Sequence, residues 1–254
     1  MRCRLTVDVD LVGQIRRLGT IDVSTGRAPD PVDAAMAAER AGVEAIAVRL
    51  REERNVIAGR DVEVLRRTVT SRLDLSLPSS QDMLTYALEV RPDRVVFVPD
   101  ERDGLAAAMA GTVDAVQARE SIARGARLMQ DAGIWVSVRI PADLDQVRAA
   151  HKANVDGVFL HGLRYSEARN HRERSEELAR IRDSAKTARK LGLEVAVGDD
   201  LGYHNAAPVA RIAEVSEIVA GHAVVARAVM VGFEQACRDL VDVLRDARID
   251  LLGS

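Results

Sequence analysis

Aromatic residues are scarce in this sequence, at 3% of 254 residues, while apolar residues as a whole reach 47%. The core therefore has to be built from valine, isoleucine, leucine and alanine. Such small and branched side chains suit parallel strands that are buried on both faces. The low aromatic content is thus a first indication of an α/β architecture.

Cysteines are also few, and long apolar runs are absent. Cys3 and Cys237 stand near opposite ends of the chain and show no C-x-x-C spacing, which argues against a disulfide framework and indicates a reducing compartment. No run of about 18 apolar residues and no signal-peptide core is present. The net charge of -3 gives no sign of a nucleic acid or anionic membrane partner. We therefore expect a cytoplasmic protein that binds neither nucleic acid nor membranes.

Short β-branched runs alternate with longer amphipathic segments along the whole chain. Eight runs are expected as strands: Leu5–Val9, Ala45–Leu50, Leu73–Leu77, Arg94–Val98, Trp135–Ile140, Gly157–His161, Leu193–Val197 and Glu217–Ala220. Eight segments between and after them are expected as helices: Pro31–Ala41, Asp61–Thr70, Gln81–Val90, Arg119–Ala132, Leu144–Ala153, Glu173–Leu191, Ala206–Ile212 and Phe233–Ala247.

Eight strands separated by helices require crossover connections, and crossovers make the strands parallel. Such units close into a barrel or form an open doubly wound sheet. The number of strands and the chain length favour a (β/α)8 TIM barrel with extra helices, as a single domain over residues 1–254. Residues 18–31 form a long loop after the first strand, and the alanine-rich residues 102–112 could add a short helix after the fourth.

A barrel places its active site at the carboxyl ends of its strands. This rule selects a polar set of residues that come at or just after each predicted strand: Asp8, Asp10, Arg49, Arg51, Asp74, Ser76, Asp100, Arg139, His161, Asp199, Asp200, Gly221 and His222.

Charges of both signs occur in this set. Arg49 and Arg51 are two residues apart on one predicted strand and share a face, so both could reach one anionic ligand. Asp8 and Asp10 share a face in the same way and need a cation, an arginine or a shared proton between them. Salt bridges to the arginines are the favoured solution. A metal held together with Asp199 and Asp200 is the alternative, although no histidine joins these carboxylates at a ligand spacing.

Gly221 and His222 follow the eighth strand and open a short helix in this interpretation. Backbone N–H groups at such a helix start form the usual phosphate site of barrel enzymes. A plain helix-capping turn explains the same dipeptide, so the motif alone decides little.

Several dispersed motifs resemble one known family, that of pyridoxine 5'-phosphate synthase, from end to end of the chain. They keep the family's order and spacing: D-P-V-D-A-A and A-E-R-A-G within residues 30–42, L-R-E-E-R at 50–54, R-D-V-E-V-L-R-R-T at 60–68, D-A-G-I-W-V-S at 131–137, Y-H-N at 203–205 and G-H-A-V-V-A-R-A-V at 221–229.

This resemblance implies a (β/α)8 barrel that assembles into ring-like octamers. It implies the condensation of 1-deoxy-D-xylulose 5-phosphate with 3-amino-2-oxopropyl phosphate, in which a pyridine ring closes and water and inorganic phosphate leave. It also implies acid–base residues at the strand ends, a small-molecule substrate, and neither a metal nor an organic cofactor.

The family's functional positions are only partly kept. The resemblance gives Asn-x-Asp-His at the end of the first strand, where this chain has Asp8, Val9, Asp10 and Leu11. It places a histidine where Arg49 stands and a glutamate where Ser76 stands. The residues carried over as catalytic, in kept or substituted form, are Asp10, Arg49, Ser76 and Asp199.

Other positions concern substrate and phosphate binding. The family's Gly-His-Gly after the seventh strand is Gly198, Asp199 and Asp200 here, so both the histidine and the second glycine are replaced. Arg16 matches a family arginine in the loop after the first strand. The residues carried over as binding residues are Asp8, Arg16, Arg51, His161, Asp200, Gly221 and His222.

The substitutions change what the site can do. Arginine cannot act as a base, and serine carries no charge, so Arg49 and Ser76 cannot replace the lost histidine and glutamate. Asp199 could act as a base, whereas Asp200 would repel a phosphate. Three hypotheses follow: a diverged enzyme that condenses or cyclises a small, phosphorylated ketose or aminoketone; an authentic pyridoxine 5'-phosphate synthase with rearranged groups; or a non-catalytic barrel that binds a small molecule or partner.

Overall fold

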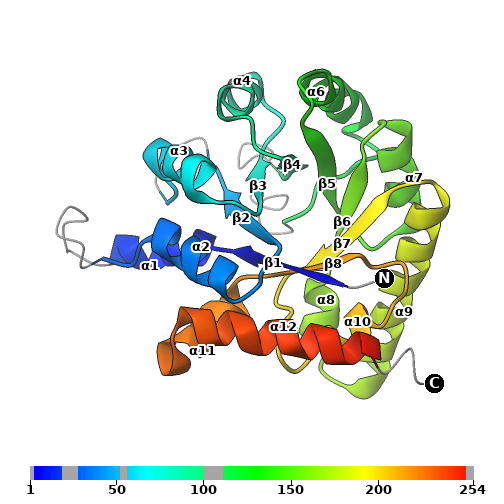
Figure 1. The fold of residues 1–254 in the computed structure, drawn as a ribbon. Coiled ribbons are helices and arrows are strands. Elements are labelled where there is room, and N and C mark those ends of the chain that lie inside the picture. The colour runs from blue at the N-terminus through cyan, green and yellow to red at the C-terminus, as the bar shows by residue number, and fades with distance from the viewer. Residues whose placement is uncertain (1–2, 19–27, 52–55, 100–110, 250–254) are drawn as a thin grey trace.

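The computed structural model describes residues 3–18, 28–51, 56–99 and 111–249. Eight parallel strands pair in sequence order, and β1 closes the barrel by pairing with β8 (Figure 1). The strands are β1 Arg4–Asp8, β2 Ala45–Arg49, β3 Arg72–Leu77, β4 Arg94–Phe97, β5 Trp135–Pro141, β6 Gly157–His161, β7 Glu194–Gly198 and β8 Glu217–Ala220. The predicted TIM barrel is confirmed, and each strand end falls within one residue of its prediction.

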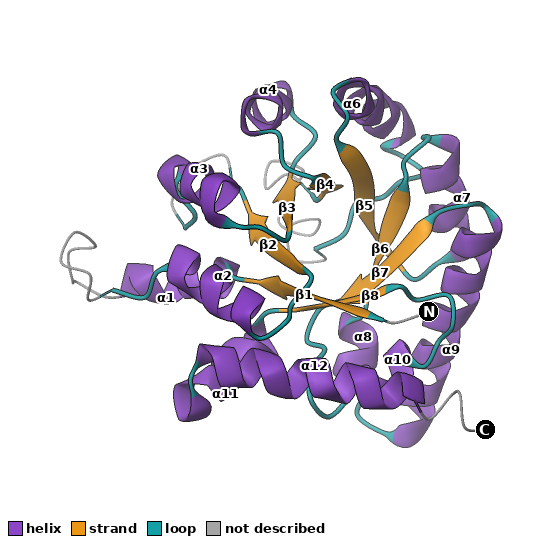
Figure 2. Ribbon diagram, in the orientation of Figure 1, coloured by secondary structure: helices purple, strands orange, loops and turns teal. Residues whose placement is uncertain are grey.

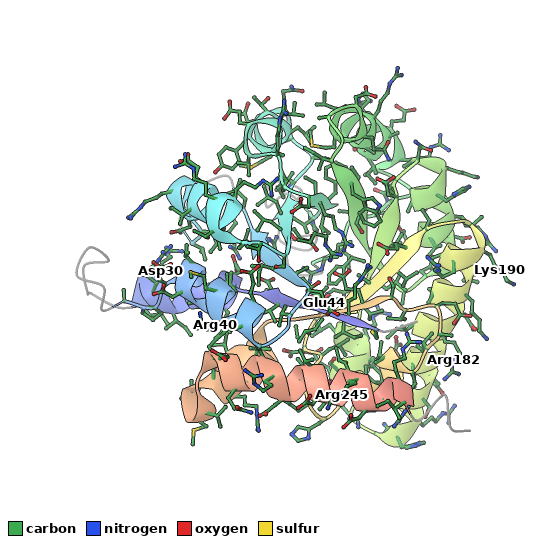
Figure 3. All side chains as sticks on the ribbon, viewed as in Figure 1. Asp30, Arg40, Glu44, Arg182, Lys190 and Arg245 are labelled. Atoms are coloured by element: carbon green, nitrogen blue, oxygen red, sulfur yellow. The ribbon has the colours of Figure 1, made fainter. Side chains whose placement is uncertain are left out.

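Helices cover the outside of the barrel (Figure 2). They are α1 Asp10–Leu18, α2 Pro31–Arg40, α3 Gly59–Thr68, α4 Gln81–Val90, α6 Arg119–Asp131, α7 Leu144–Lys152, α8 Leu163–Ser166, α9 His171–Lys190, α10 Ala206–Ala210, α11 His222–Val231 and α12 Phe233–Ile249. Charged residues such as Arg182 and Lys190 of α9 lie on the outer surface (Figure 3).

Local signals set most helix boundaries. The Asp30 side chain accepts a hydrogen bond from the backbone N–H of Val32, and Pro31 follows it at the first helical position, so the predicted N-cap is confirmed. Gly42 and Gly133 adopt φ values of 87° and 78° at the predicted helix-to-strand turns, a conformation that favours glycine. All eight predicted helices are found, and each of their ends lies within two residues of the predicted position.

The sequence interpretation missed α1 and α8. Helix α1 begins at Asp10, directly after β1, where the carboxylate of Asp8 accepts a hydrogen bond from the backbone N–H of Asp10 at 2.8 Å. Of the loop expected over residues 18–31, Leu18 belongs to this helix and residues 19–27 lie outside the described structure. The short helix expected at 102–112 falls almost entirely outside the described residues as well.

Two faces of the strands bury different kinds of residue. Side chains that point outward, such as Val7, Ile46 and Leu75, join the large core beneath the helices. Side chains that point inward form a separate small apolar cluster halfway along the barrel, composed of Val96, Val98, Phe159 and Ala196 with Val219 packed against it.

The amino-terminal end of the barrel is filled with charges instead of apolar side chains. Glu217, 1% exposed, accepts hydrogen bonds from Arg72 at 2.7 Å, from Arg94 at 3.1 Å and from the hydroxyl of Thr6 at 2.6 Å. Arg72 also donates two hydrogen bonds to Asp74, at 2.7 and 3.0 Å. We call this set, completed by Arg4 and Glu194, the floor network.

The three arginines of the floor network pair with its three carboxylates. Burial alone would raise the pKa of Glu217, but the positive charges of Arg94 and Arg72 hold that pKa below its usual value. The guanidinium of Arg94 also lies 4.4 Å from the ring centre of Trp135, a cation–π contact. These contacts join strands on opposite sides of the barrel.

Two further predictions concern cysteines and membranes. Cys3 and Cys237 are both buried and free in the structure. Within the described ranges, no helix has the length and apolar character needed to span a bilayer.

Candidate active site

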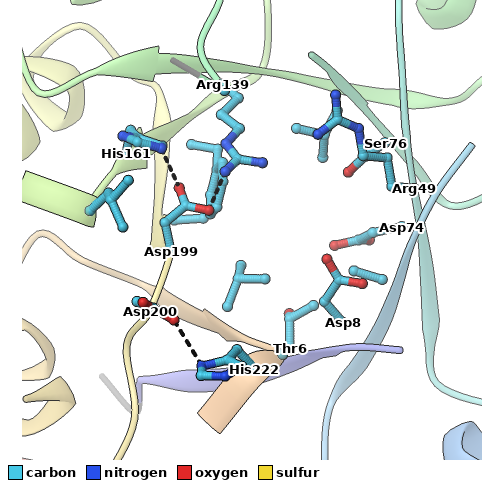
Figure 4. Close-up of a pocket in the computed structure, with 18 of the residues that line it drawn as sticks. Thr6, Asp8, Arg49, Asp74, Ser76, Arg139, His161, Asp199, Asp200 and His222 are labelled. Carbon is cyan, nitrogen blue, oxygen red and sulfur yellow. Dashed lines mark hydrogen bonds and ion pairs between the residues drawn. The ribbon is translucent and has the colours of Figure 1, made fainter. Parts of the chain in front are cut away.

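A cavity of about 440 Å³ opens at the carboxyl ends of the strands and reaches down to the floor network (Figure 4). It lies where barrel enzymes place their catalytic residues. Eight of the eleven predicted site residues line it: Asp8, Arg49, Ser76, His161, Asp199, Asp200, Gly221 and His222. The convergence of these strand ends, expected from sequence order, is therefore found.

Asp8 and Asp10 belong to different elements, although the sequence analysis placed them on one face. Asp8 is the last residue of β1 and lines the cavity, whereas Asp10 opens α1 and is not among the lining residues. Both carboxylate oxygens of Asp10 bind Arg51, at 2.8 and 3.0 Å, and one also accepts from Gln14. The favoured solution, a salt bridge to an arginine, is thus what the structure has for Asp10.

The Asp8 carboxyl group lies in a different environment from that of Asp10. Burial raises the pKa of Asp8 to about 7, and the negative charge of Asp10 acts in the same direction. Its hydrogen bond from the backbone N–H of Asp10, and the charges of Arg139 and Arg51, lower the pKa only in part. Asp8 therefore changes charge close to neutral pH.

The expectation that Arg49 and Arg51 reach one ligand together is wrong for the described structure. Strand β2 ends at Arg49, so the alternation of side chains does not continue to Arg51. Arg49 lines the cavity and pairs in register with Ser76 of β3, while Arg51 is bound to Asp10 outside the cavity lining. Arg49 and Ser76 lie together in the cavity wall (Figure 4).

Asp199 connects two other strands across the cavity. One of its oxygens binds the guanidinium of Arg139 from β5, and the other lies 3.4 Å from Nε2 of His161 from β6. Arg139 also stacks over Phe159, with 5.1 Å between its guanidinium carbon and the ring centre. Burial lowers the pKa of His161, and the charge of Arg139 adds to this, while Asp199 opposes it. Burial therefore favours the neutral form of the His161 imidazole by lowering its pKa.

The start of α11 forms another part of the cavity wall. Gly221 precedes the helix, and a Cβ there would lie 3.1 Å from the backbone oxygen of Asp8. His222, the first helical residue, has Nδ1 3.2 Å from the carboxylate of Asp200. The carboxylate of Asp200 therefore lies beside the helix start, where the phosphate site was expected.

The backbone directly after β7 is unusual. Asp199 and Asp200 have φ values of 76° and 55°, in the left-handed region that glycine adopts more readily than other residues. At position 200 this conformation agrees with the glycine that the family resemblance gives. The side chain has changed while the backbone has kept a conformation that suits glycine, and such backbone strain is concentrated at functional sites.

Arg16 is placed differently from its prediction. It lies within helix α1 instead of a loop, and it is not among the residues that line the cavity. Its guanidinium donates to Asp61 at 3.0 Å and to the backbone oxygen of Val56 at 3.0 Å, which ties α1 to the start of α3. The positive charge of Arg16 is thus occupied by a structural pair, and its phosphate-binding role stays a prediction.

Several lining residues received no role from the sequence. Arg139 and Asp74 were selected as strand-end residues but were not assigned a function, and Phe159 and Gly111 were not selected. Gly111 packs against Arg139 and His161. Alternation along β5 and β6 could have found Arg139 and Phe159, because every second residue of these strands points into the barrel.

Potential metal ligands do not cluster in the described parts of the chain. Among the residues that the structure describes, no group of three or more histidine, cysteine, aspartate or glutamate side chains is arranged to hold an ion.

Fold and site together define a (β/α)8 barrel with a polar cavity at its carboxyl rim, the place where barrel enzymes bind and convert their substrates. The sequence model of the family described as "Pyridoxal phosphate biosynthesis protein PdxJ" matches residues 5–246. The chain belongs to this family.

Close relatives share this assignment over their full lengths. The chain is 39% identical to the pyridoxine 5'-phosphate synthase of Idiomarina loihiensis over 245 residues, which cover 96% of this chain and 98% of the relative. It is also 39% identical to the protein of the same name from Syntrophotalea carbinolica, covering 96% of this chain and 99% of the relative.

Solved structures with the same fold are much more distant in sequence. A 3-hexulose-6-phosphate synthase structure has a TM-score of 0.61 at 12% identity, covering 96% of this chain and 99% of that one. A thiamine phosphate pyrophosphorylase from Pyrococcus furiosus has a TM-score of 0.58 at 14% identity, with 96% of each chain covered. These likenesses establish the barrel fold and nothing more specific.

Proposed function

We propose that this chain is a biosynthetic enzyme of the pyridoxine 5'-phosphate synthase type that condenses or cyclises a small phosphorylated ketose or aminoketone, with acid–base groups that differ from those of the family. The observation that carries the proposal is the rim cavity, which brings cations, carboxyl groups and a histidine together in one space. A barrel that had lost its function would have no reason to direct these charges inward.

Cations in the cavity suit an anionic substrate. Arg49 lines the wall next to Ser76, and the guanidinium of arginine matches phosphate oxygens with two parallel hydrogen bonds. In this proposal Arg49 binds the anionic group of the substrate, and Ser76 donates or accepts a neutral hydrogen bond beside it. The carboxylate of Asp200 lies by the start of α11 and repels a phosphate there. The positive charge of Arg49 makes the wall that holds Arg49 the more favourable place for the phosphate.

The opposite wall supplies the second half of the chemistry. Asp199 holds Arg139 and lies 3.4 Å from His161, which fixes these side chains relative to one another. A neutral imidazole can both donate and accept a hydrogen bond, so His161 can bind a substrate hydroxyl or carbonyl. Arg51 binds both carboxylate oxygens of Asp10 outside the cavity lining, and this salt bridge fixes the start of α1.

Two alternatives are distinguished by one assay. The purified protein is incubated with 1-deoxy-D-xylulose 5-phosphate and 3-amino-2-oxopropyl phosphate, while released inorganic phosphate is measured and binding of each compound is followed by calorimetry. We expect the ketose phosphate to bind without full turnover to the pyridine product, because Arg49 and Ser76 cannot move protons. Full turnover would establish the authentic synthase instead, and failure to bind either compound would support a non-catalytic barrel.

Arg49→Ala tests the assignment of the anionic group. Loss of a charged hydrogen-bond partner costs about 1.5–3 kcal/mol, so we expect the dissociation constant of 1-deoxy-D-xylulose 5-phosphate to rise about 10- to 100-fold. Calorimetry measures this, and Arg182→Ala on the exposed surface of α9 is the matched control. Equal affinity of Arg49→Ala and the parent protein would rule out Arg49 as the anion site.

We further propose that copies of the chain associate through the face formed by α1 and α11. Leu18 is 85% exposed, and Val229 and Met230 are 78% and 83% exposed, an arrangement that is costly in water. Helices α1 and α11, which carry these exposed side chains, pack against each other. Free buried cysteines fit the proposed cytoplasmic setting of such an assembly.

Met230→Glu is expected to shift the protein towards the 27.6 kDa monomer, because a buried unpaired carboxylate in an apolar interface is strongly unfavourable. Light scattering after size exclusion measures the mass. Leu128→Glu, which alters an exposed apolar residue of α6, should leave it unchanged. A parent protein that is already monomeric would contradict the proposed assembly.

A further inference from the structure

We infer that Asp8 is the proton-transfer residue of the cavity: its carboxylate removes a proton from the carbon next to the carbonyl group of the substrate and later returns it. This inference rests on the proposed function, since it requires a ketose or aminoketone in the rim cavity. It assigns to Asp8 the role that the substituted positions Arg49 and Ser76 cannot fill.

The surroundings of Asp8 leave its carboxyl group open to a ligand. It ends β1 and pairs in register with Ala47 of β2, whose side chain is a single methyl group. On the side of β8 lies Gly221, and an added Cβ there would come within 3.3 Å of the Cβ of Asp8. With an alanine and a glycine as neighbours, the carboxyl group of Asp8 points into the cavity (Figure 4).

Asp8 differs from the other carboxyl groups around the cavity in its partners. Its hydrogen bond comes from the backbone N–H of Asp10 at 2.8 Å, and it forms no salt bridge with any residue in the described parts of the chain. The other carboxylates are each held by a cationic or histidine side chain: Asp10 by Arg51, Asp74 by Arg72 and Arg94, Asp199 by Arg139, and Asp200 by His222.

The charges that face Asp8 suit proton exchange near neutral pH. Burial raises its pKa to about 7, and the neighbouring Asp10 of α1 acts in the same direction. Arg51 after β2 and Arg139 of β5 act against it from further away. Further charged or titratable groups line the same cavity from other parts of the barrel: Arg49 of β2, Asp74 of β3, Arg94 of β4, His161 of β6, Asp199 and Asp200 after β7, and His222 of α11. A general base works best when its pKa lies near the working pH.

The proposed step is balanced as a simple enolisation. A C–H bond next to the carbonyl breaks, and its proton forms an O–H bond on the Asp8 carboxylate. The electron pair of that C–H bond moves into the carbonyl group, so its oxygen becomes negatively charged. His161 lines the same cavity and can donate a hydrogen bond to this oxygen, while Arg49 holds the phosphate group. Return of the proton from Asp8 regenerates the carboxylate.

The test is proton exchange into 1-deoxy-D-xylulose 5-phosphate in D2O, followed by 1H NMR as loss of the signals next to the ketone, with calorimetry on the same samples. We expect Asp8→Asn to lower the exchange rate at least about 100-fold and to keep the dissociation constant within about threefold. The exchange rate of the parent protein should rise with pH and level off above about 7, whereas the residual rate of Asp8→Asn should lack this transition.

Two further variants make the result specific. Asp8→Glu keeps a carboxyl group and should retain more exchange than Asp8→Asn, and Asp183→Asn on the exposed face of α9 should behave like the parent protein. Unchanged exchange in Asp8→Asn would overturn the inference, as would a loss of exchange that merely follows a loss of binding. A parent protein that binds the ketose but exchanges no protons overturns the role of Asp8 alone, whereas one that does not bind the ketose overturns the proposed function as well.

Discussion

Replacement of Glu217 by alanine is expected to lower the free energy of unfolding by about 3–5 kcal/mol. Glu217 is 1% exposed and faces Arg72, Arg94 and Arg4, so its removal leaves buried guanidinium groups without their main counter-charge. The pKa of Glu217 is held below its usual value, so the loss is fully present at neutral pH and shrinks as the solution becomes acidic. Urea unfolding at pH 7 measures the difference.

Glu176→Ala is the matched control for this experiment. Glu176 pairs with Arg172 on the exposed surface of α9, and such pairs contribute about 0–1 kcal/mol. If Glu217→Ala were no more destabilising than Glu176→Ala, the floor network would contribute little to stability, and its arginines would have to be satisfied by water.

Asp8→Asn is expected to have the opposite effect and to stabilise the protein at pH 8, on the order of 2–4 kcal/mol. The pKa of Asp8 is raised from its usual value of 3.8 to about 7, so the folded protein holds this proton more tightly than the unfolded chain does. Above pH 7 the carboxylate is charged in both states, and the folded state carries the cost of burying that charge. Asparagine removes the charge, and its side-chain oxygen can still accept the hydrogen bond from Asp10.

The pH dependence gives this prediction its sign. Below about pH 4 the Asp8 carboxyl group is protonated in both states, so Asp8→Asn should gain nothing there. The gain should appear between pH 4 and pH 7 and stay constant above pH 7. Thermal or urea unfolding across this range measures it, and a variant that is equally stable at pH 4 and pH 8 relative to the parent protein would contradict a raised pKa. An expected gain in stability at a residue proposed to act in catalysis is the usual trade-off between activity and stability.

The strands could be predicted because each one carries its own signal. Runs such as those now seen in β6 and β8 are short, apolar and rich in branched residues, and glycine turns separate several of them from the preceding helices. Helix α1 escaped prediction because it follows β1 with a single residue between them and has no separate loop to mark its start. The same absence explains why Asp8 and Asp10 were read as neighbours on one strand.

Site prediction succeeded where a rule of position was enough. Position at or just after a strand was enough to select Asp199, His161 and Gly221, which the family resemblance also indicated, and the structure brings all three to one cavity. The rule failed for Arg51, whose side chain binds Asp10 outside the cavity lining. Arg16, which the family resemblance placed in a loop, lies in α1 and binds Asp61 outside the cavity lining. Whether an arginine serves a ligand or a neighbouring helix depends on contacts that position along the chain does not reveal.

The sequence by itself determined the order of strands and helices, the barrel they form and the rim at which polar residues gather, because these follow from the period of apolar residues and from local capping. Only the tertiary structure decided which charges pair. Arg139 meets Asp199 and Glu217 meets Arg72 because barrel closure brings distant strands to within a few ångströms. Electrostatic pairing and desolvation act over such short distances, and no local pattern along the chain encodes them.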